Sequence, residues 1–132
     1  MTMKKGRCLC EAISFEYSGD EIWRGHCHCE SCRRSTSSPF TTFLGVPRDA
    51  FRFTGSEPSV YQSSTGVRRL FCGTCGTQIA YESDRYPDEI HFYAASLEQS
   101  ATFEPQFHTY YGERLPWIEI ADDLPKYQKP GK

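Results

Sequence analysis

The chain has 132 residues, the size of one domain, with 24% charged residues and a formal net charge of −2. This balance argues against a strongly basic nucleic-acid-binding surface and a polybasic membrane patch, and no apolar run is long enough to cross a bilayer. The start, MTMKKGRCLC, has positive charges without an apolar segment behind them, unlike a secretory signal, so we expect a cytoplasmic protein with no nucleic-acid or membrane partner.

Short runs rich in β-branched and aromatic residues follow one another along the chain and predict mainly β structure. In the first, AISFEY at 12–17, apolar residues alternate, which puts Ile13, Phe15 and Tyr17 on one face. The later runs lie at 41–46, 59–64, 67–71, 77–82, 89–95 and 106–111. Clusters of Gly, Pro, Asp and Ser separate them. We therefore expect sheets packed as a sandwich, with aromatic side chains, 14% of the residues, supplying the core.

Helix is expected only as short turns, a single one after Cys29 and another within VPRDAF at 46–51. No repeat, low-complexity segment or linker divides the sequence, so we predict one domain over 1–132. The last residues are polar, and we expect 126–132 to be a frayed tail.

Seven cysteines fall into three clusters with metal-type spacing. They are Cys8 and Cys10; Cys27, Cys29 and Cys32; and Cys72 and Cys75. An odd number cannot be paired completely as disulfides, and in a reducing compartment such spacings are more typical of metal ligands. The seven can be divided into a set of four and a set of three.

The C-x-x-C in FCGTCG is typical of a zinc knuckle, because a glycine after each cysteine lets backbone N–H groups turn toward the sulfurs. A knuckle supplies two ligands, Cys72 and Cys75, and needs two more. Cys8 and Cys10 are the natural donors, which predicts a closed structural zinc site of four cysteines. The alternative is that Cys8 and Cys10 are ordinary small buried residues.

The stretch GHCHCESCRR at 25–34 keeps the other three thiolates together. Three protein ligands, with the fourth position open to water or substrate, is how catalytic zinc is held, and we favour that interpretation. His26 and His28 are alternative fourth ligands, although in an extended segment they would point away from the neighbouring cysteines. His91 and His108 are more distant alternatives, and His91 is also explained as a strand residue that faces solvent or is a hydrogen-bond partner.

The order of these motifs resembles the glutathione-dependent formaldehyde-activating enzyme family, which also contains the centromere protein V domain. The resemblance runs over about 6–125. The matching residues are Gly6, Cys8 and Cys10; Cys27, His28, Cys29, Cys32 and Arg33; Phe71, Cys72, Cys75 and Gly76; Pro116 and Trp117; and Asp122, Leu124 and Pro125.

The resemblance implies a small zinc-stapled β-sandwich-like fold, similar to that of methionine-R-sulfoxide reductases and a Rab exchange factor. It implies two zinc ions per chain, a structural one on the set of four cysteines and a catalytic one on the set of three. The implied activity joins glutathione and formaldehyde as S-hydroxymethylglutathione, or cleaves the carbon–sulfur bond of that adduct.

An open zinc held by three thiolates suits chemistry on a thiol. Three thiolates and one Zn²⁺ sum to −1, so the metal is a poorer Lewis acid than in a site of three neutral histidines, and strong activation of water is less expected. A substrate thiol in the fourth position would lose its proton and become the nucleophilic thiolate. We therefore expect a carbon–sulfur lyase or synthase whose partner is a small-molecule thiol such as glutathione.

Positive groups are expected to compensate for the excess negative charge of this cluster. Arg33 and His28 are candidates for a catalytic role, pairing with the thiolates or with a substrate carboxylate. Arg34 is equally well explained as a solvated surface residue. Arg68 and Arg69, just before the knuckle, are expected on opposite faces of a strand.

No motif defines the rest of a substrate site, so its walls are predicted only from position and aromatic content. The candidates are 37–43, 82–89 and 107–117, and within the last of these we interpret Trp117 as a core residue.

A second class of function is a zinc-stabilised protein-interaction module in which both metal sites are structural. A fourth protein ligand on the set of three cysteines would favour this alternative. Methionine sulfoxide reduction ranks below both, because it needs a metal-free redox cysteine and the division into four and three leaves none.

Overall fold

The computed structural model describes residues 3–129, which form ten strands, one α-helix and four 3₁₀ turns. The strands are β1 (Met3–Arg7), β2 (Ser14–Ser18), β3 (Trp23–Cys27), β4 (Thr41–Pro47), β5 (Phe51–Phe53), β6 (Ser59–Ser64), β7 (Val67–Phe71), β8 (Gln78–Ser83), β9 (Glu89–Tyr93) and β10 (Phe107–Thr109). The helix is α1 (Glu30–Thr36), and the 3₁₀ turns are η1 (Arg48–Ala50), η2 (Ala94–Ser96), η3 (Ser100–Thr102) and η4 (Tyr111–Glu113). The prediction of a mainly β chain is confirmed.

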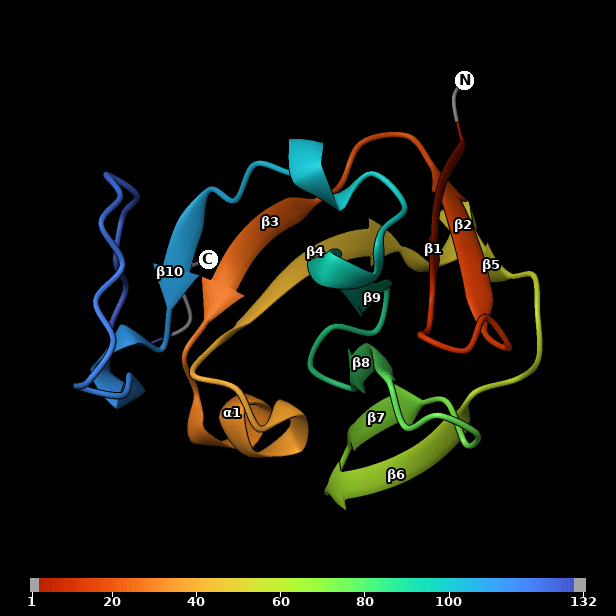
Figure 1. Ribbon diagram of the computed structural model, residues 1–132, viewed down its shortest axis with the longest axis horizontal. Coiled ribbons are helices and arrows are strands. Elements are labelled where there is room, and N and C mark those ends of the chain that lie inside the picture. Colours follow the sequence, from red (N-terminus) through yellow and green to blue (C-terminus); the bar gives the residue numbers. More distant parts are fainter. Residues whose placement is uncertain (1–2, 130–132) are drawn as a thin grey trace.

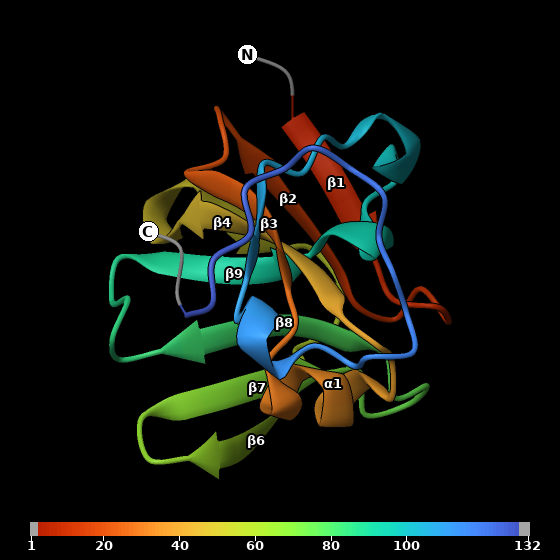
Figure 2. The same cartoon turned by 90° about the vertical axis from the view of Figure 1, so that its left-hand side faces the viewer.

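The strands form two sheets, one of three strands in the order β1-β2-β5 and one of seven in the order β10-β3-β4-β9-β8-β7-β6 (Figure 1). Neighbouring strands are antiparallel except β10, which runs parallel to β3 at the edge of the larger sheet. Figure 2 shows β9, β8, β7 and β6 side by side, with the C-terminal segment crossing in front of β3. The larger sheet therefore brings the end of β3, α1 and the β7–β8 strands to one side of the molecule.

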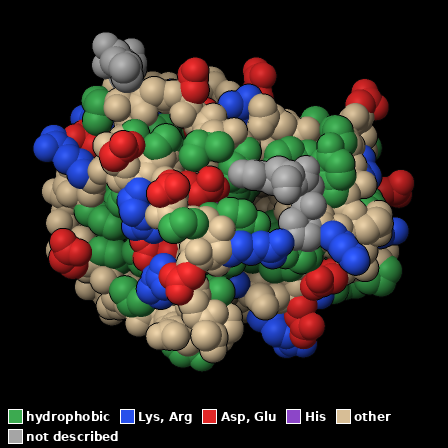
Figure 3. All heavy atoms as spheres, turned by 180° about the vertical axis from the view of Figure 1, so that it is seen from behind, with side chains coloured by type: hydrophobic (Ala, Val, Ile, Leu, Met, Phe, Trp, Pro, Cys, Tyr) green, Lys and Arg blue, Asp and Glu red, His purple; other side chains and the backbone are tan. Residues whose placement is uncertain are grey.

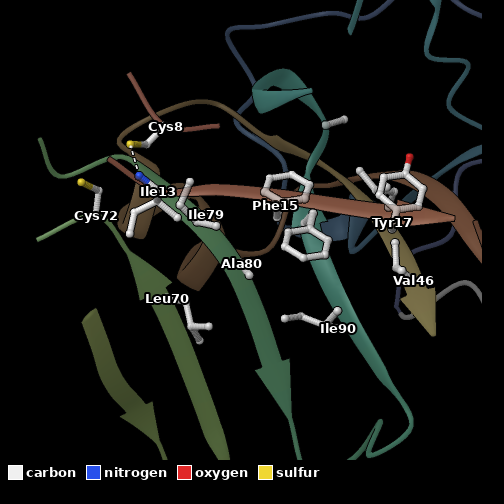
Figure 4. Packing of buried hydrophobic residues seen from close by; sticks show 13 residues of the cluster. Cys8, Ile13, Phe15, Tyr17, Val46, Leu70, Cys72, Ile79, Ala80 and Ile90 are labelled. Atoms are coloured by element: carbon white, nitrogen blue, oxygen red, sulfur yellow. Dashed lines mark hydrogen bonds between the residues drawn. The ribbon is translucent and has the colours of Figure 1, made fainter. Parts of the chain in front are cut away.

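The main core lies between the two sheets (Figure 4). Ile13, Phe15 and Tyr17 are all buried, as the alternation in AISFEY predicts. The ring of Phe15 stacks on that of Phe92 from β9 with a centroid distance of 4.0 Å. Each fully buried side chain of this size contributes about 1.5–3 kcal/mol relative to an exposed one, so this contact joins the two sheets strongly.

Cysteines close one end of this core. Cys8 and Cys72 are buried and belong to the same cluster of apolar side chains, and Figure 4 shows them beside Ile13. The backbone N–H of Ile13 donates to the sulfur of Cys8 at 3.3 Å. The end of the core is thus continuous with a cluster of sulfurs.

Three details of the chain differ from the sequence expectations. Helix α1 has seven residues, about two turns rather than one. Trp117 is 70% exposed, so the prediction that it packs in the core is wrong. Residues 126–129 are not frayed, because the backbone N–H of Tyr127 donates to the carbonyl of His108 at 2.9 Å and the carbonyl of Lys129 accepts from Tyr110. The rest of the predicted tail, 130–132, lies outside the described residues.

The surface has no dominant charge on the face drawn in Figure 3, where acidic and basic side chains are interspersed. Within residues 3–129, no helix has the length and apolar character needed to span a membrane.

Candidate metal centres and substrate pocket

The four cysteines assigned to a closed site come together at one end of the core. The sulfurs of Cys8, Cys10, Cys72 and Cys75 all lie within 4.8 Å of one another. The Cys8–Cys10 and Cys10–Cys72 sulfur distances are both 3.7 Å. Two sulfurs bound to one tetrahedral zinc at about 2.3 Å would lie about 3.8 Å apart, so this donor set fits zinc.

Backbone and hydroxyl groups orient these sulfurs. The N–H of Cys75 points to the sulfur of Cys72 at 3.4 Å, in the turn that Gly76 closes with a φ of +83°. The hydroxyl of Thr77 lies 3.1 Å from the sulfur of Cys75 and is the main cause that lowers the pKa of this thiol to about 5. Cys75 is therefore favoured in the thiolate form that a metal ligand requires.

The other three cysteines meet where β3 ends and α1 begins. Cys27 is the last residue of β3, Cys29 is the N-cap of α1, and Cys32 lies in the first turn. The sulfur of Cys29 accepts from the backbone N–H of Cys32 at 3.3 Å, and the sulfurs of Cys27 and Cys32 are 3.8 Å apart. This spacing also fits zinc. Within residues 3–129, no histidine or carboxylate joins the three sulfurs as a fourth donor.

Arg69, on β7, is the arginine that approaches these sulfurs. Its side chain is 5% exposed, and its Nη1 lies 3.9 Å from the sulfur of Cys32 and 3.2 Å from the hydroxyl of Ser35. The guanidinium also lies over the ring of Tyr81, 5.1 Å from its centroid. Hydrogen bonds from the neighbouring thiols, together with Arg69, hold the pKa of Cys32 well below its usual range despite burial.

Arg33 does not pair with the thiolates, which was one of its two expected roles; the other, pairing with a substrate carboxylate, stays a prediction. Its Nε donates to the backbone carbonyl of His28 at 3.3 Å, and it lies in a different surface hollow beside Trp117. Arg34 is 76% exposed and pairs with Glu30 on the surface of α1. Arg68 and Arg69 do lie on opposite faces of β7, since Arg68 pairs with acidic residues while Arg69 is buried beside the sulfurs. Because side chains alternate between the two faces of a strand, the sequence RRL at 68–70 could have indicated that Arg69 faces the sulfurs.

The three sulfurs lie in the wall of a pocket of about 340 Å³. Of the predicted walls, 37–43 contributes only Phe43 and 82–89 contributes Arg85 and Tyr86. The segment 107–117 contributes Phe107, Thr109, Tyr110 and Glu113. Sequence reasoning missed the other lining residues. Among them are Trp23, Ser63, Ser64, Val67, Arg69 and Tyr81. The pocket thus has aromatic walls with cationic and anionic groups beside the sulfurs.

The histidines considered as fourth ligands do not group with the three sulfurs. The Nε2 of His28 bonds with Nδ1 of His108 at 2.8 Å, and Nε2 of His108 bonds with a carboxylate oxygen of Asp122 at 2.8 Å. His26 bonds instead with the hydroxyl of Thr42. Burial, reinforced by His108, lowers the pKa of both His26 and His28 to about 4, so both are neutral at pH 7. His91 is buried and bonds with Glu89, which agrees with its interpretation as a hydrogen-bonded strand residue.

A family model described as glutathione-dependent formaldehyde-activating enzyme matches residues 3–113. The chain belongs to this family. The matched range contains all three cysteine clusters, and it ends before Trp117 and Asp122, which the motif resemblance had included.

Two curated relatives match most of the chain. An uncharacterized lyase of Schizosaccharomyces pombe is 33% identical over 104 residues, which cover 77% of this chain and 75% of the relative. A Halomonas elongata protein with the provisional name of a glutathione-dependent formaldehyde-activating enzyme is 25% identical over 125 residues, 88% of this chain and 80% of the relative.

A solved structure supports the fold. The crystal structure of a Rhodobacter sphaeroides protein, a structural genomics target, matches with a TM-score of 0.64 and 24% identity, and covers 80% of this chain and 99% of that chain.

Proposed function

We propose that this protein is a zinc-dependent enzyme that forms or cleaves a carbon–sulfur bond in a thiol–aldehyde adduct such as S-hydroxymethylglutathione. Membership of the family and the names of the two relatives, a lyase and a glutathione-dependent formaldehyde-activating enzyme, support a lyase-type activity on a thiol. The observation that carries the proposal is a set of three sulfurs, spaced for a metal and without a fourth donor in residues 3–129, in the wall of a pocket.

Two zinc ions per chain would be held by this chain's cysteines. Cys8, Cys10, Cys72 and Cys75 would hold a structural ion, and Cys27, Cys29 and Cys32 a catalytic one. When bound at the second set, zinc supplies an exchangeable position that favours the thiolate form of a substrate thiol. In the synthetic direction a new sulfur–carbon bond forms and the thiol proton ends on the carbonyl oxygen of the aldehyde. Cleavage reverses both changes.

The pocket residues would bind and orient the thiol. The guanidinium of Arg69 beside Cys32 offsets the negative charge that three thiolates leave on the cluster. Arg85 and Glu113 add charges of both signs to the same pocket, which suits a substrate that carries carboxylates and an ammonium group, as glutathione does. The rings of Trp23 and Tyr81 supply apolar walls that exclude water from the reacting atoms.

The alternative, an interaction module with two structural metal sites, is less well supported. It predicts a closed ligand set at the second cluster, whereas three sulfurs beside a pocket leave room for an exogenous ligand. Within residues 3–129, neither His26 nor His28 groups with the three sulfurs, and Nε2 of His28 is bonded to His108.

The decisive experiment measures metal content and thiol chemistry together. We expect two zinc ions per chain and acceleration of adduct exchange between formaldehyde and one member of a thiol panel, followed by NMR exchange spectroscopy. Cys29→Ala should abolish the acceleration while the circular dichroism spectrum stays native. If no thiol–aldehyde pair is accelerated by the fully metallated protein, the enzyme proposal fails.

Cobalt substitution tests the open position directly. Adding a substrate thiol should strengthen the sulfur-to-cobalt charge-transfer band, because a fourth sulfur joins the three of the chain. If added thiols leave the cobalt spectrum unchanged but the His28→Ala substitution alters it, His28 is the fourth ligand and the interaction module is favoured.

A further inference from the structure

A third group of metal-ligand side chains lies on the opposite face of β3 from the sulfurs. Ligand atoms of His26, His108 and Asp122 all lie within 4.8 Å of one another. His26 and His108 are paired in register across the parallel strands β3 and β10, so their side chains share one face of the sheet. Cys27 follows His26 directly and points to the other face. The histidine group is therefore separate from the pocket of the proposed reaction.

Each of the three side chains is oriented by a second contact. The Nδ1 of His26 bonds with the hydroxyl of Thr42 at 2.8 Å, which leaves its Nε2 available. The Nδ1 of His108 bonds with His28 at 2.8 Å, which leaves its Nε2 facing Asp122. Such outer contacts, which fix the ring and the tautomer, are the usual surroundings of a histidine that binds a metal.

The carboxylate of Asp122 is oriented in the same way. Its Oδ1 accepts from Nζ of Lys126 at 3.1 Å and from the backbone N–H of Leu124 at 3.2 Å. Its Oδ2 faces His108 at 2.8 Å. Oδ1 is thus occupied by other groups of this chain, and Oδ2 faces the imidazole of His108.

We propose that His26, His108 and Asp122 form a binding site for a divalent first-row transition ion such as Co²⁺, Ni²⁺ or Zn²⁺. Two imidazole nitrogens and one carboxylate oxygen form a donor set that these ions accept readily, whereas Mg²⁺ and Ca²⁺ prefer oxygen ligands alone. Without a metal, the His108–Asp122 hydrogen bond joins two of the three donors. Coordination through Nε2 of His108 places its proton on Nδ1, where His28 accepts it.

Exposure and charge set how this site should behave. The side chain of Asp122 is 25% exposed and that of His108 is 0% exposed, so an ion can enter from the side of Asp122. The ammonium of Lys126 beside the carboxylate lowers the attraction for a cation. The site should therefore bind more weakly than the thiolate clusters and fill only after them.

The test adds Co²⁺ alone to untagged protein whose thiolate sites already hold two equivalents of zinc. We expect one further equivalent to bind, with d–d bands of cobalt but without a sulfur-to-cobalt charge-transfer band. His108→Gln and Asp122→Asn should each weaken this binding at least tenfold, and Thr42→Val should weaken it by about tenfold because it removes only an orienting contact. His91→Gln is the matched control, a buried histidine outside the group, and should leave the binding unchanged.

Melting curves accompany each variant, and His26→Gln, at a half-buried position, replaces any variant that does not fold. Absence of a third equivalent, or a third equivalent that His26→Gln, His108→Gln and Asp122→Asn leave intact, would reduce the group to a hydrogen-bonded network and overturn the proposal. Neither result depends on whether the sulfur-lined pocket catalyses any reaction.

Discussion

The two cysteine clusters use the same side chain in different surroundings. The set of four joins two turns at one end of the main apolar core, of which Cys8 and Cys72 are part. The set of three sits at the start of α1, where Cys27 and Cys32 pack in a smaller apolar cluster beside Arg69 and the wall of a pocket. The roles that we propose, a site that holds the fold and a site that accepts a ligand, therefore rest on the number of donors and their neighbours rather than on the ligand type.

The largest effect should come from breaking the set of four. Cys72→Ser should unfold the protein or sharply lower its melting temperature, because a structural zinc contributes on the order of 10 kcal/mol to the folding of small domains. Cys8→Ser should behave alike. Thermal unfolding followed by circular dichroism, together with zinc analysis, measures this effect. The control is Cys29→Ser, which removes a cysteine of the other cluster and should stay folded. If Cys72→Ser keeps its full zinc content and the melting temperature of the unmodified protein, the set of four does not hold a structural zinc.

Removal of metal should distinguish the clusters by order. A mild chelator should take one equivalent first, from the set of three, since an exchangeable position gives it access. The circular dichroism spectrum should not change in this phase, and it should become that of an unfolded chain when the second equivalent is lost. Loss of both equivalents in one step, together with unfolding, would show that the clusters have no separate roles.

A smaller effect is expected at Arg69. Arg69→Gln should weaken zinc binding at the set of three by about 10- to 100-fold, because the buried guanidinium beside Cys32 is lost, while the other site is unaffected. Arg69→Lys should recover part of the loss by keeping the charge. Competition with a chromogenic chelator measures both sites, and equal affinities in Arg69→Gln and the unmodified protein would contradict the role given to this residue.

The smallest effect is expected at Arg34, on the outer surface of the same helix. Its ion pair with Glu30 is exposed and spaced i,i+4, so Arg34→Ala should change the free energy of unfolding by only about 0.3–0.5 kcal/mol. Thiol and zinc binding should not change. If Arg34→Ala weakens zinc binding as much as Arg69→Gln does, then any positive charge near α1 supports zinc binding and the buried contact of Arg69 is not required.

The sequence was most informative where a local rule governs the structure. Alternation predicted the buried face of Ile13, Phe15 and Tyr17, and the spacing of the cysteines predicted both sulfur clusters. Strands β1, β3 and β5 were not assigned. The first, MKKGR, has no β-branched or aromatic residue, the second contains a cysteine, a histidine and a glycine, and the third has only three residues.

What could not be predicted depends on contacts between distant segments. Arg69 reaches Cys32 only because the fold brings β7 close to α1. Asp122 reaches His108 only because the C-terminal segment folds back over β10. Trp117 belongs to the same segment, and its apolar character alone gave no reason to expect exposure. A local pattern carries no information on such pairings, which loop closure and packing decide.

The parallel strand β10 has a consequence for how the molecule assembles. The contact between the sulfurs of Cys10 and Cys72 spans 62 residues, and every cysteine has been synthesised once the ribosome has passed Cys75. The contact between His28 and His108 spans 80 residues. Loop closure costs about 4 kcal/mol of chain entropy for either contact, so the order of synthesis, and not loop length, separates them. A nascent chain can therefore gather its sulfurs while Tyr110 and Glu113 are still missing from the pocket, so the capacity to hold metal should precede the capacity to bind substrate during synthesis.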